Sequence, residues 1–211
     1  KRIGAEESGE FKAVASGTLP SGKPVVINAD GTVSVVSETS ATQALGSATV
    51  FEAATSTDIV GTFDSNSNKV VIVYRDAGNS DYGTAVVGTV SGTSISFGTP
   101  VVFENGYTTY IGVTFDSTNN KVVIAYRDGG NSAYGTAIVG TVSGTSISFG
   151  TAVVFASGDT RYISLIYDSN AQKVVIAFAD ADNSYYGKAI VGTVSGTSIS
   201  FGSAVNFFFF F

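Results

Sequence analysis

The sequence contains no cysteine, histidine, methionine or tryptophan. Without Cys it has no disulfides, no catalytic thiolate and no thiolate metal ligand. Without His it lacks the most common general base and the most common ligand of transition metals. We therefore expect no cofactor and no thiol or histidine chemistry.

Charge is also sparse. Charged residues make up 13% of the chain, and the formal net charge is −6. No cluster of Lys and Arg occurs, and an acidic chain without a basic patch repels phosphate backbones, so nucleic acid is not an expected partner. No apolar run approaches the roughly 18 residues of a membrane helix, so we expect no membrane insertion. The abundant residues are Gly, Ser, Thr, Val and Ala, which favour short strands joined by tight turns.

The two ends of the sequence are unusual. It starts at Lys1, although a translated chain starts with Met, so we expect a processed or partial product from which no signal peptide can be read. It ends in five consecutive Phe at 207–211, and an exposed run of this kind would aggregate. We expect the last four to be placeholders or a misreading, which makes this tail unreliable.

A period of 52 residues runs through most of the chain. The string KVVI starts at Lys69, Lys121 and Lys173, so successive copies lie 52 residues apart. The three unchanged copies of the string GTVSGTSISFG lie at 88–98, 140–150 and 192–202. Self-similarity at a fixed period of this length is typical of repeat proteins.

The period divides the chain into an opening segment and a series of repeats. The predicted parts are 1–47, an N-terminal β segment; 48–100, 101–152 and 153–204, three repeats; and 205–211, the start of a fourth repeat. Phe51, Phe103, Phe155 and Phe207 also keep the period, which places the fourth repeat where the run of Phe begins.

Each repeat is predicted to contain four strands separated by turn residues. In the middle copy these strands are 110–116, 121–127, 134–143 and 145–155. The first three are apolar on both faces, whereas the fourth starts with alternating apolar and small residues. A sheet covered on both faces at its inner strands and half-solvated at its outer strand is what a propeller blade requires. The sequence predicts an all-β fold of tandem four-stranded antiparallel repeats, a β-propeller or propeller-like blade array; a β-solenoid or a sandwich are the alternatives.

Side-chain alternation predicts the core. We expect one antiparallel meander per repeat, with its first strand the most buried and its fourth the most exposed. The residues expected in equivalent buried places are Phe63, Phe115 and Tyr167, with Val71, Val123 and Val175. Because three blades cannot close a ring, we expect the outer face of the third repeat, around Ile163, Leu165 and Ile176, to contact another chain or further blades.

The first 47 residues do not keep the period. Short strands are predicted at 11–17, 23–28 and 32–37, joined by turns at 20–22 and 30–31. Two interpretations stay open. The segment is either a separate attachment unit or a degenerate blade whose fourth strand is 48–52.

Loops on one face of the array differ more between the copies than loops on the other. In a propeller, the loops between strands 2 and 3 and from strand 4 into the next strand 1 share a face. There the copies read AATSTD, NGYTTY and SGDTRY in one loop set and RDAGNSDY, RDGGNSAY and ADADNSYY in the other. The opposite face keeps SGTS unchanged. Variation on one face of a copied unit indicates recognition; drift in exposed loops is the alternative.

The candidate ligand-binding residues lie in these variable loops. Arg beside Tyr can bind a carboxylate or stack on a sugar ring. A structural ion pair or turn cap that repeats with the blade is the alternative. The third copy has Ala179 in place of Arg, so no ring of Arg surrounds a centre. The candidates are Arg75, Asp76, Tyr107, Tyr110, Arg127, Asp128, Asp159, Arg161 and Tyr162.

No metal site and no catalytic site is expected. The segment DADN at 180–183 resembles a Ca²⁺ loop only weakly, because the Gly and the bidentate Glu of an EF-hand are missing. Paired carboxylates hydrolyse glycosides, but each Asp of the repeats is predicted at a turn, where Asp caps the backbone. Glu52 and Glu104 have Ala156 as their counterpart. The Ser-x-Asp-x-Gly-x-x-Trp box of sialidase blades is also missing, so we expect no enzyme.

The middle repeat, KVVIAYRDGGNSAYGTAIVGTVSGTSISFGTAVVF, resembles repeats in large structural proteins of marine tailed bacteriophages, especially phages of cyanobacteria, which are described as tail-fibre-like. The N-terminal GTLPSGKPVVINADGTVSVV is similar to short β segments that precede such arrays. Similar repeats also occur in bacterial surface proteins. The resemblance covers nearly the whole chain, implies a virion appendage with a role in surface attachment, and transfers no site residue.

Three functions are compatible with these observations. The first is a virion appendage or fibre protein, on the virion or extracellular, whose loops contact a cell surface and its glycans. The second is a purely structural decoration or filament subunit that contacts neighbouring copies. The third is a secreted bacterial propeller lectin. In the first two, the expected partners are other virion or appendage subunits, including copies of the chain itself in a homo-oligomer.

Overall fold

The computed structural model describes residues 13–36 and 45–207. The chain divides into two compact units, Lys1–Ala44 and Leu45–Phe211, which are described separately below. The outer ends of the strands predicted at 11–17 and 32–37, and the tail at 208–211, lie outside the described residues. In the described part, no helix is long and apolar enough to cross a membrane.

The smaller unit contains a three-stranded sheet in the order β1-β3-β2. β2 (Val25–Ile27) and β3 (Thr32–Val35) form an antiparallel hairpin, and β1 (Val14–Ala15) pairs with β3 in parallel. In the hairpin turn, Asp30 accepts hydrogen bonds from the backbone and the hydroxyl of Thr32, at 2.9 and 2.7 Å. These bonds hold the pKa of Asp30 below its ordinary value. The predicted strands are present, although each is shorter than expected.

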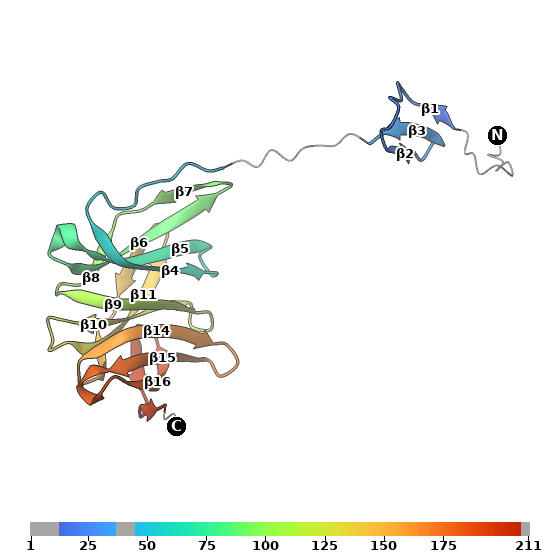
Figure 1. Ribbon diagram of the computed structural model, residues 1–211. Helices are drawn as coiled ribbons and strands as arrows, with labels where there is room; N and C mark the ends of the chain where they lie inside the picture. The colour runs from blue at the N-terminus through green and yellow to red at the C-terminus, as the bar shows by residue number, and fades with distance from the viewer. Residues whose placement is uncertain (1–12, 37–44, 208–211) are drawn as a thin grey trace. The chain divides into compact units, whose positions relative to one another are not determined.

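The larger unit contains three similar antiparallel sheets, one per repeat (Figure 1). The first sheet consists of β4 (Ser56–Asp64), β5 (Lys69–Asp76), β6 (Tyr82–Ser91), β7 (Ser94–Phe97) and β8 (Val101–Glu104). The second consists of β9 (Thr108–Asp116), β10 (Lys121–Asp128), β11 (Tyr134–Ser143), β12 (Ser146–Phe149) and β13 (Val153–Ala156). The third consists of β14 (Thr160–Asp168), β15 (Lys173–Asp180), β16 (Tyr186–Ser195), β17 (Ser198–Phe201) and β18 (Val205–Asn206). The predicted antiparallel meander and its 52-residue repeat are confirmed.

The fourth strand of each repeat was predicted as one strand and is two. β12 pairs with one end of β11, and β13 pairs with the other end of the same strand. The break falls at Gly150, whose backbone lies against the next repeat. A Cβ on Gly150 would lie 1.9 Å from the Thr197 carbonyl oxygen. The outer edge therefore bends where the hairpin turn of the next repeat approaches it.

Two apolar cores lie between consecutive sheets. We call the side of a sheet toward the preceding repeat its rear face and the other side its front face. The first core joins the front face of repeat 1 to the rear face of repeat 2, and the second joins repeats 2 and 3 in the same way. The first contains Val71, Val73, Val87, Ile111, Phe115, Val122, Ile124 and Tyr126. The second contains Val123, Ala125, Val139, Phe155, Ile163, Val174, Ile176 and Phe178. A repeat thus buries its apolar faces only with its neighbours.

The aromatic residues predicted in the core are buried to different extents in the three repeats. Phe115 is 9% exposed and packs in the first core, as predicted. Its counterpart Phe63 is 53% exposed, because the described residues include no repeat against the rear face of repeat 1. Tyr167 is half-buried against the second core. The prediction is therefore confirmed at Phe115 and wrong at Phe63.

The valines of the predicted core lie on the face opposite to the aromatic residues. Val71 and Val123 are buried, as predicted, but they belong to front faces, opposite to Phe115. Val175, predicted to be buried with them, is half-buried, because it lies on the front face of the last repeat. The prediction that the first strand is the most buried is also wrong in all three repeats, because β4, β9 and β14 lie at the edges of their sheets and are less buried than β5, β10 and β15.

The open side of repeat 3 is its front face. Val191 on this face is 46% exposed, whereas its counterpart Val139 is 0% exposed. Ile163, Leu165 and Ile176 were predicted to form the open side. Ile163 and Ile176 are instead buried in the second core, and Leu165 packs against it. The alternation of apolar side chains along a strand identifies residues that share a face of the sheet. It does not show whether that face packs on the preceding or the following repeat.

Candidate functional site

A β-bulge interrupts the first strand of each repeat at the same position. The pairing of β4 with β5 shifts between Thr57 and Val60, and the equivalent pairings of β9 and β14 shift in the same way. The bulge residues Asp58, Tyr110 and Tyr162 have φ angles of 50°, 51° and 51°, a region that few residues other than Gly adopt. A bulge residue is left out of the ladder, which re-aims its side chain.

The three bulges lie next to one another, because β4 and β14 each lie against β9. The Tyr110 amide donates a hydrogen bond to Asp58 Oδ1 at 2.9 Å. The rings of Tyr110 and Tyr162 meet edge to face, with centroids 5.2 Å apart. The bulges therefore place one residue from each repeat in a continuous row.

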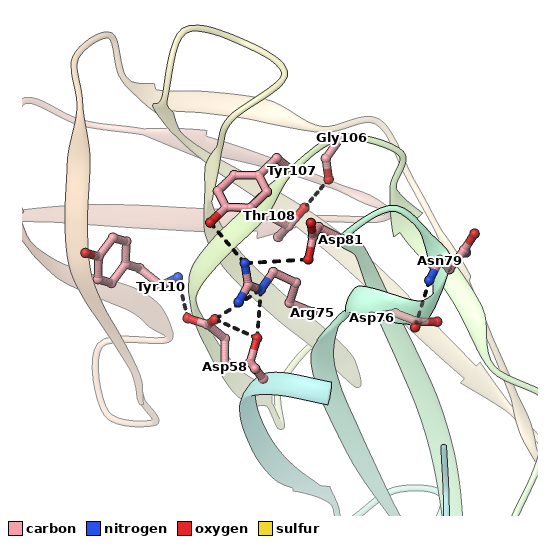
Figure 2. Close-up of polar contacts among 10 residues, drawn as sticks. Asp58, Arg75, Asp76, Asn79, Asp81, Gly106, Tyr107, Thr108 and Tyr110 are labelled. Carbon is pink, nitrogen blue, oxygen red and sulfur yellow. Dashed lines mark hydrogen bonds and ion pairs between the residues drawn. The ribbon is translucent and has the colours of Figure 1, made fainter. Parts of the chain in front are cut away.

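Arg75, at the end of β5, is held from several sides (Figure 2). Its Nε donates to Thr57 Oγ1 at 2.7 Å and its Nη1 to the Tyr107 hydroxyl at 3.0 Å. Its guanidinium lies 5.2 Å from the centre of the Tyr107 ring. Asp58 and Asp81 each lie 3.6 Å from a guanidinium nitrogen. Two carboxylates thus surround one cation.

A second cluster reverses this ratio, with two cations around one carboxylate. Asp159 Oδ1 accepts from Arg127 Nε at 2.6 Å, and Oδ2 accepts from Arg161 Nη2 at 2.6 Å and Nε at 3.0 Å. Arg161 Nη1 also donates to the Tyr185 hydroxyl at 3.0 Å. The hydrogen bond from Arg161, and to a smaller extent that from Arg127, holds the pKa of Asp159 below its ordinary value. The hydrogen bond to Asp159 in turn raises the pKa of Arg161. Asp159 and Arg161 are therefore both charged at neutral pH.

An open depression of about 380 Å³ lies between the two clusters. It is lined by Asp58, Tyr107, Thr109, Tyr110, Arg127 and Arg161. These residues come from all three repeats, and we call them, together with Arg75, Asp159, Tyr162 and Tyr185, the Arg–Tyr surface. It combines guanidinium donors, carboxylate and hydroxyl acceptors and aromatic rings, which together suit a polar ligand with an apolar side.

The nine predicted site residues separate into two groups. Seven belong to the Arg–Tyr surface: Arg75, Tyr107, Tyr110, Arg127, Asp159, Arg161 and Tyr162. Asp76 and Asp128 are nearly buried and cap turns, where they accept hydrogen bonds from the backbone of Asn79 and Asn131 at 3.1 and 3.0 Å. Figure 2 shows Asp76 turned toward Asn79, away from the Arg75 cluster. Burial raises the pKa of Asp128.

Sequence reasoning missed Asp58, Asp81 and Tyr185. A position-by-position comparison of the copies would have found them. Asp58 stands where the other repeats have Tyr110 and Tyr162, and Tyr185 stands where repeat 1 has Asp81. Positions that change between otherwise identical repeats therefore make up much of this surface.

Within residues 13–36 and 45–207, no group of three or more carboxylates gathers as a metal site would require. No family model matches the chain, and a search of curated proteins also finds no match. The Arg–Tyr surface is therefore interpreted from its own geometry.

Repeats 1 and 2 each contain a partly buried Glu–Tyr pair. The Tyr126 hydroxyl donates to Glu104 Oε2 at 2.9 Å, and Tyr74 bonds Glu52 at 3.3 Å. Burial raises the pKa of Glu104, and the hydrogen bond from Tyr126 opposes this only in part. Burial and the charge of Glu104 in turn raise the pKa of Tyr126.

Replacing Glu104 by glutamine should change how stability depends on pH. Because the pKa of Glu104 is raised in the folded state, the folded protein binds this proton more tightly than the unfolded chain. The wild type therefore loses stability as pH rises from the ordinary value of 4.5 through the raised pKa. We expect the free energy of unfolding of Glu104→Gln minus that of the wild type to become more positive from about pH 4 to about pH 7. Urea titrations measure it, and a difference that is flat or falls with pH contradicts the assignment.

Proposed function

We propose that this chain is a non-enzymatic binding module of a virion or other extracellular appendage, and that the Arg–Tyr surface attaches it to a saccharide of a cell surface. The observation that carries this proposal is the depression of about 380 Å³ lined by residues of all three repeats. A surface built from positions that differ between copied units is typical of recognition.

The chemistry of the Arg–Tyr surface suits a saccharide. Sugar hydroxyls both donate and accept hydrogen bonds, and the depression offers Arg donors beside the Asp58 carboxylate. The C–H faces of a sugar ring pack on aromatic rings such as those of Tyr107 and Tyr110. The resemblance of the repeats to those of tail-fibre-like phage proteins supports the same role.

The geometry of the sheets also supports a propeller. The first strands β4, β9 and β14 lie side by side (Figure 1). The strands β7, β12 and β17 lie at the opposite edges of their sheets. In a propeller the strands nearest the axis pack together in this way. We therefore interpret the sheets as consecutive blades, with the Arg–Tyr surface at the axial end of their first strands.

Replacing Arg161 by alanine tests this attachment role. The substitution removes a side chain that lines the depression and leaves Asp159 its bond from Arg127. Losing a charged hydrogen-bond donor from a binding site should weaken saccharide binding about tenfold or more. A glycan array identifies the ligand with the wild type, and titration with that ligand measures the loss. Lys121→Ala, which removes a charge at the opposite end of the strands, is the matched control. Failure of the wild type to bind any glycan, or equal binding by both variants, rejects the proposal.

A second candidate function, a structural subunit that stacks on copies of itself, is favoured by the two open faces. The rear face of repeat 1 exposes Ile59 and Phe63, and the front face of repeat 3 exposes Ile166, Val191 and Val205. Two such contacts already exist within the chain. The rear face of repeat 2 packs on the front face of repeat 1, and the rear face of repeat 3 packs on the front face of repeat 2. Two chains can therefore join end to end through an interface that the molecule already contains.

A further inference from the structure

The third repeat departs from the other two around one buried position. Repeats 1 and 2 have the Glu–Tyr pairs of Glu52 with Tyr74 and Glu104 with Tyr126. Repeat 3 has Ala156 and Phe178 at these two positions, so it lacks both the carboxylate and the hydroxyl. Tyr126 is fully buried and fills this part of repeat 2.

A pocket of about 330 Å³ lies at this place in repeat 3. Ala156 and Phe178 both line it, together with Phe155, so the two replacements border the open space directly. Its volume is in the range of small-molecule sites. The pocket is closed on one side by the aromatic rings, which are almost completely buried in the second core.

Polar residues particular to repeat 3 line the same pocket. Lys188 stands where repeats 1 and 2 have Thr84 and Thr136, and its Nζ lies 2.5 Å from Asp180 Oδ2. Asp180 does not cap the turn that follows it, although its counterpart Asp76 does. The carboxylate is therefore directed to Lys188 instead of to the backbone.

A second carboxylate completes the polar side. Asp182 stands where the other repeats have Gly78 and Gly130, and its Oδ2 accepts a hydrogen bond from the Asp159 backbone at 2.9 Å. Four positions that touch one pocket thus differ together from copies that are otherwise nearly the same. Drift in exposed loops does not account for this set, because Phe178 is buried and Ala156 and Lys188 are partly buried.

We propose that this pocket binds a single uncharged sugar ring. Lys188 donates to a hydroxyl oxygen, and Asp180 accepts from a neighbouring hydroxyl, so a pair of adjacent hydroxyls satisfies both. Phe155 and Phe178 offer an apolar wall to the C–H side of the ring. One ammonium and two carboxylates give the pocket a net negative charge, which disfavours anionic sugars.

The pocket is separate from the Arg–Tyr surface but shares a wall with it. Ser157, Gly158 and Thr160 line the pocket, and Asp159, in the same loop, holds Arg127 and Arg161 on the other side. The inference does not require that the Arg–Tyr surface binds a ligand. The two sites can be removed independently, because none of the side chains that line the pocket lines the depression.

The double variant Ala156→Glu/Phe178→Tyr tests the proposal, because it introduces the pair that repeats 1 and 2 already accommodate. Full-length wild type and variant are titrated with methyl glycosides of glucose, galactose, mannose and N-acetylglucosamine, and with methyl glucuronide as the anionic arm. Calorimetry or NMR shift changes report binding. We expect the wild type to bind at least one neutral glycoside and not the glucuronide, and the filled variant to bind at least about tenfold more weakly with its Tm retained.

Two further variants separate the possible outcomes. Lys188→Thr restores the residue type of the other repeats and should also weaken binding about tenfold. Arg161→Ala should leave binding of the small glycoside unchanged, even if it abolishes attachment through the Arg–Tyr surface. The proposal is overturned if no neutral glycoside binds the wild type, if the glucuronide binds preferentially, or if the filled variant binds as well as the wild type.

Discussion

Replacing Phe115 by alanine should lower the free energy of unfolding by about 3–5 kcal/mol. The ring packs in the core between repeats 1 and 2, where its removal leaves a cavity that the rigid strands cannot close. The loss should be seen in urea denaturation followed by circular dichroism, at a protein concentration low enough to keep the chain monomeric.

Phe63→Ala is the matched control, because the same ring stands at the same position of repeat 1 and is about half exposed. In dilute solution we expect it to cost less than about 1 kcal/mol, since little cavity forms at an uncovered position. Equal losses for the two variants would mean that the rear face of repeat 1 is covered in solution. A small loss for Phe115→Ala would contradict the packing between repeats 1 and 2.

Replacing Val191 by aspartate should abolish end-to-end association of the chain. Val191 lies on the open front face of repeat 3, and stacking on the rear face of a second copy would bury a carboxylate without a partner. We expect the wild type to show a molar mass above that of one chain that falls on dilution, and the variant to remain a monomer at all concentrations. Light scattering coupled to size-exclusion chromatography measures both.

Val154→Asp is the control for this experiment. Val154 is similarly exposed, at 42%, but lies in β13 of the middle repeat, away from the two end faces. It should leave association unchanged. A monomeric wild type, or a Val154→Asp variant that dissociates as fully as Val191→Asp, would argue against stacking through the end faces.

Periodicity and turn residues were sufficient to predict the repeat and its first three strands. The hairpin between β11 and β12 illustrates why. Gly144 has φ of 61° and is the first residue of a two-residue turn, a position where the favoured turns require positive φ. Such local rules act within a few residues and can be recognised in a single copy. The placement of the variable loops on one face then follows from the order of antiparallel strands.

The orientation of the sheet faces, the bulges and the pocket of repeat 3 could not be predicted in the same way. Both faces of the inner strands are apolar, so alternation alone could not tell that Val123 faces repeat 3 while Phe115 faces repeat 1. The bulges at Asp58, Tyr110 and Tyr162 have no fixed sequence signal, because three different contexts adopt the same backbone. The pocket of repeat 3 depends on residues far apart in the sequence that meet only through the pairing of β15 and β16.

The identity of the hairpins also bears on how the chain reaches its fold. β12 and β17 have the same sequence, SISF, so β11 could form the same backbone hydrogen bonds with either. The two pairings differ in the length of the loop that each must close. The native turn between Ser143 and Ser146 is two residues long, whereas the swapped pairing would close a loop of more than fifty residues, at an additional entropic cost of about 3 kcal/mol. Correct assembly therefore depends on neighbouring strands meeting first. Release of the chain from the ribosome in order favours this, because each hairpin is complete before its duplicate has been synthesised.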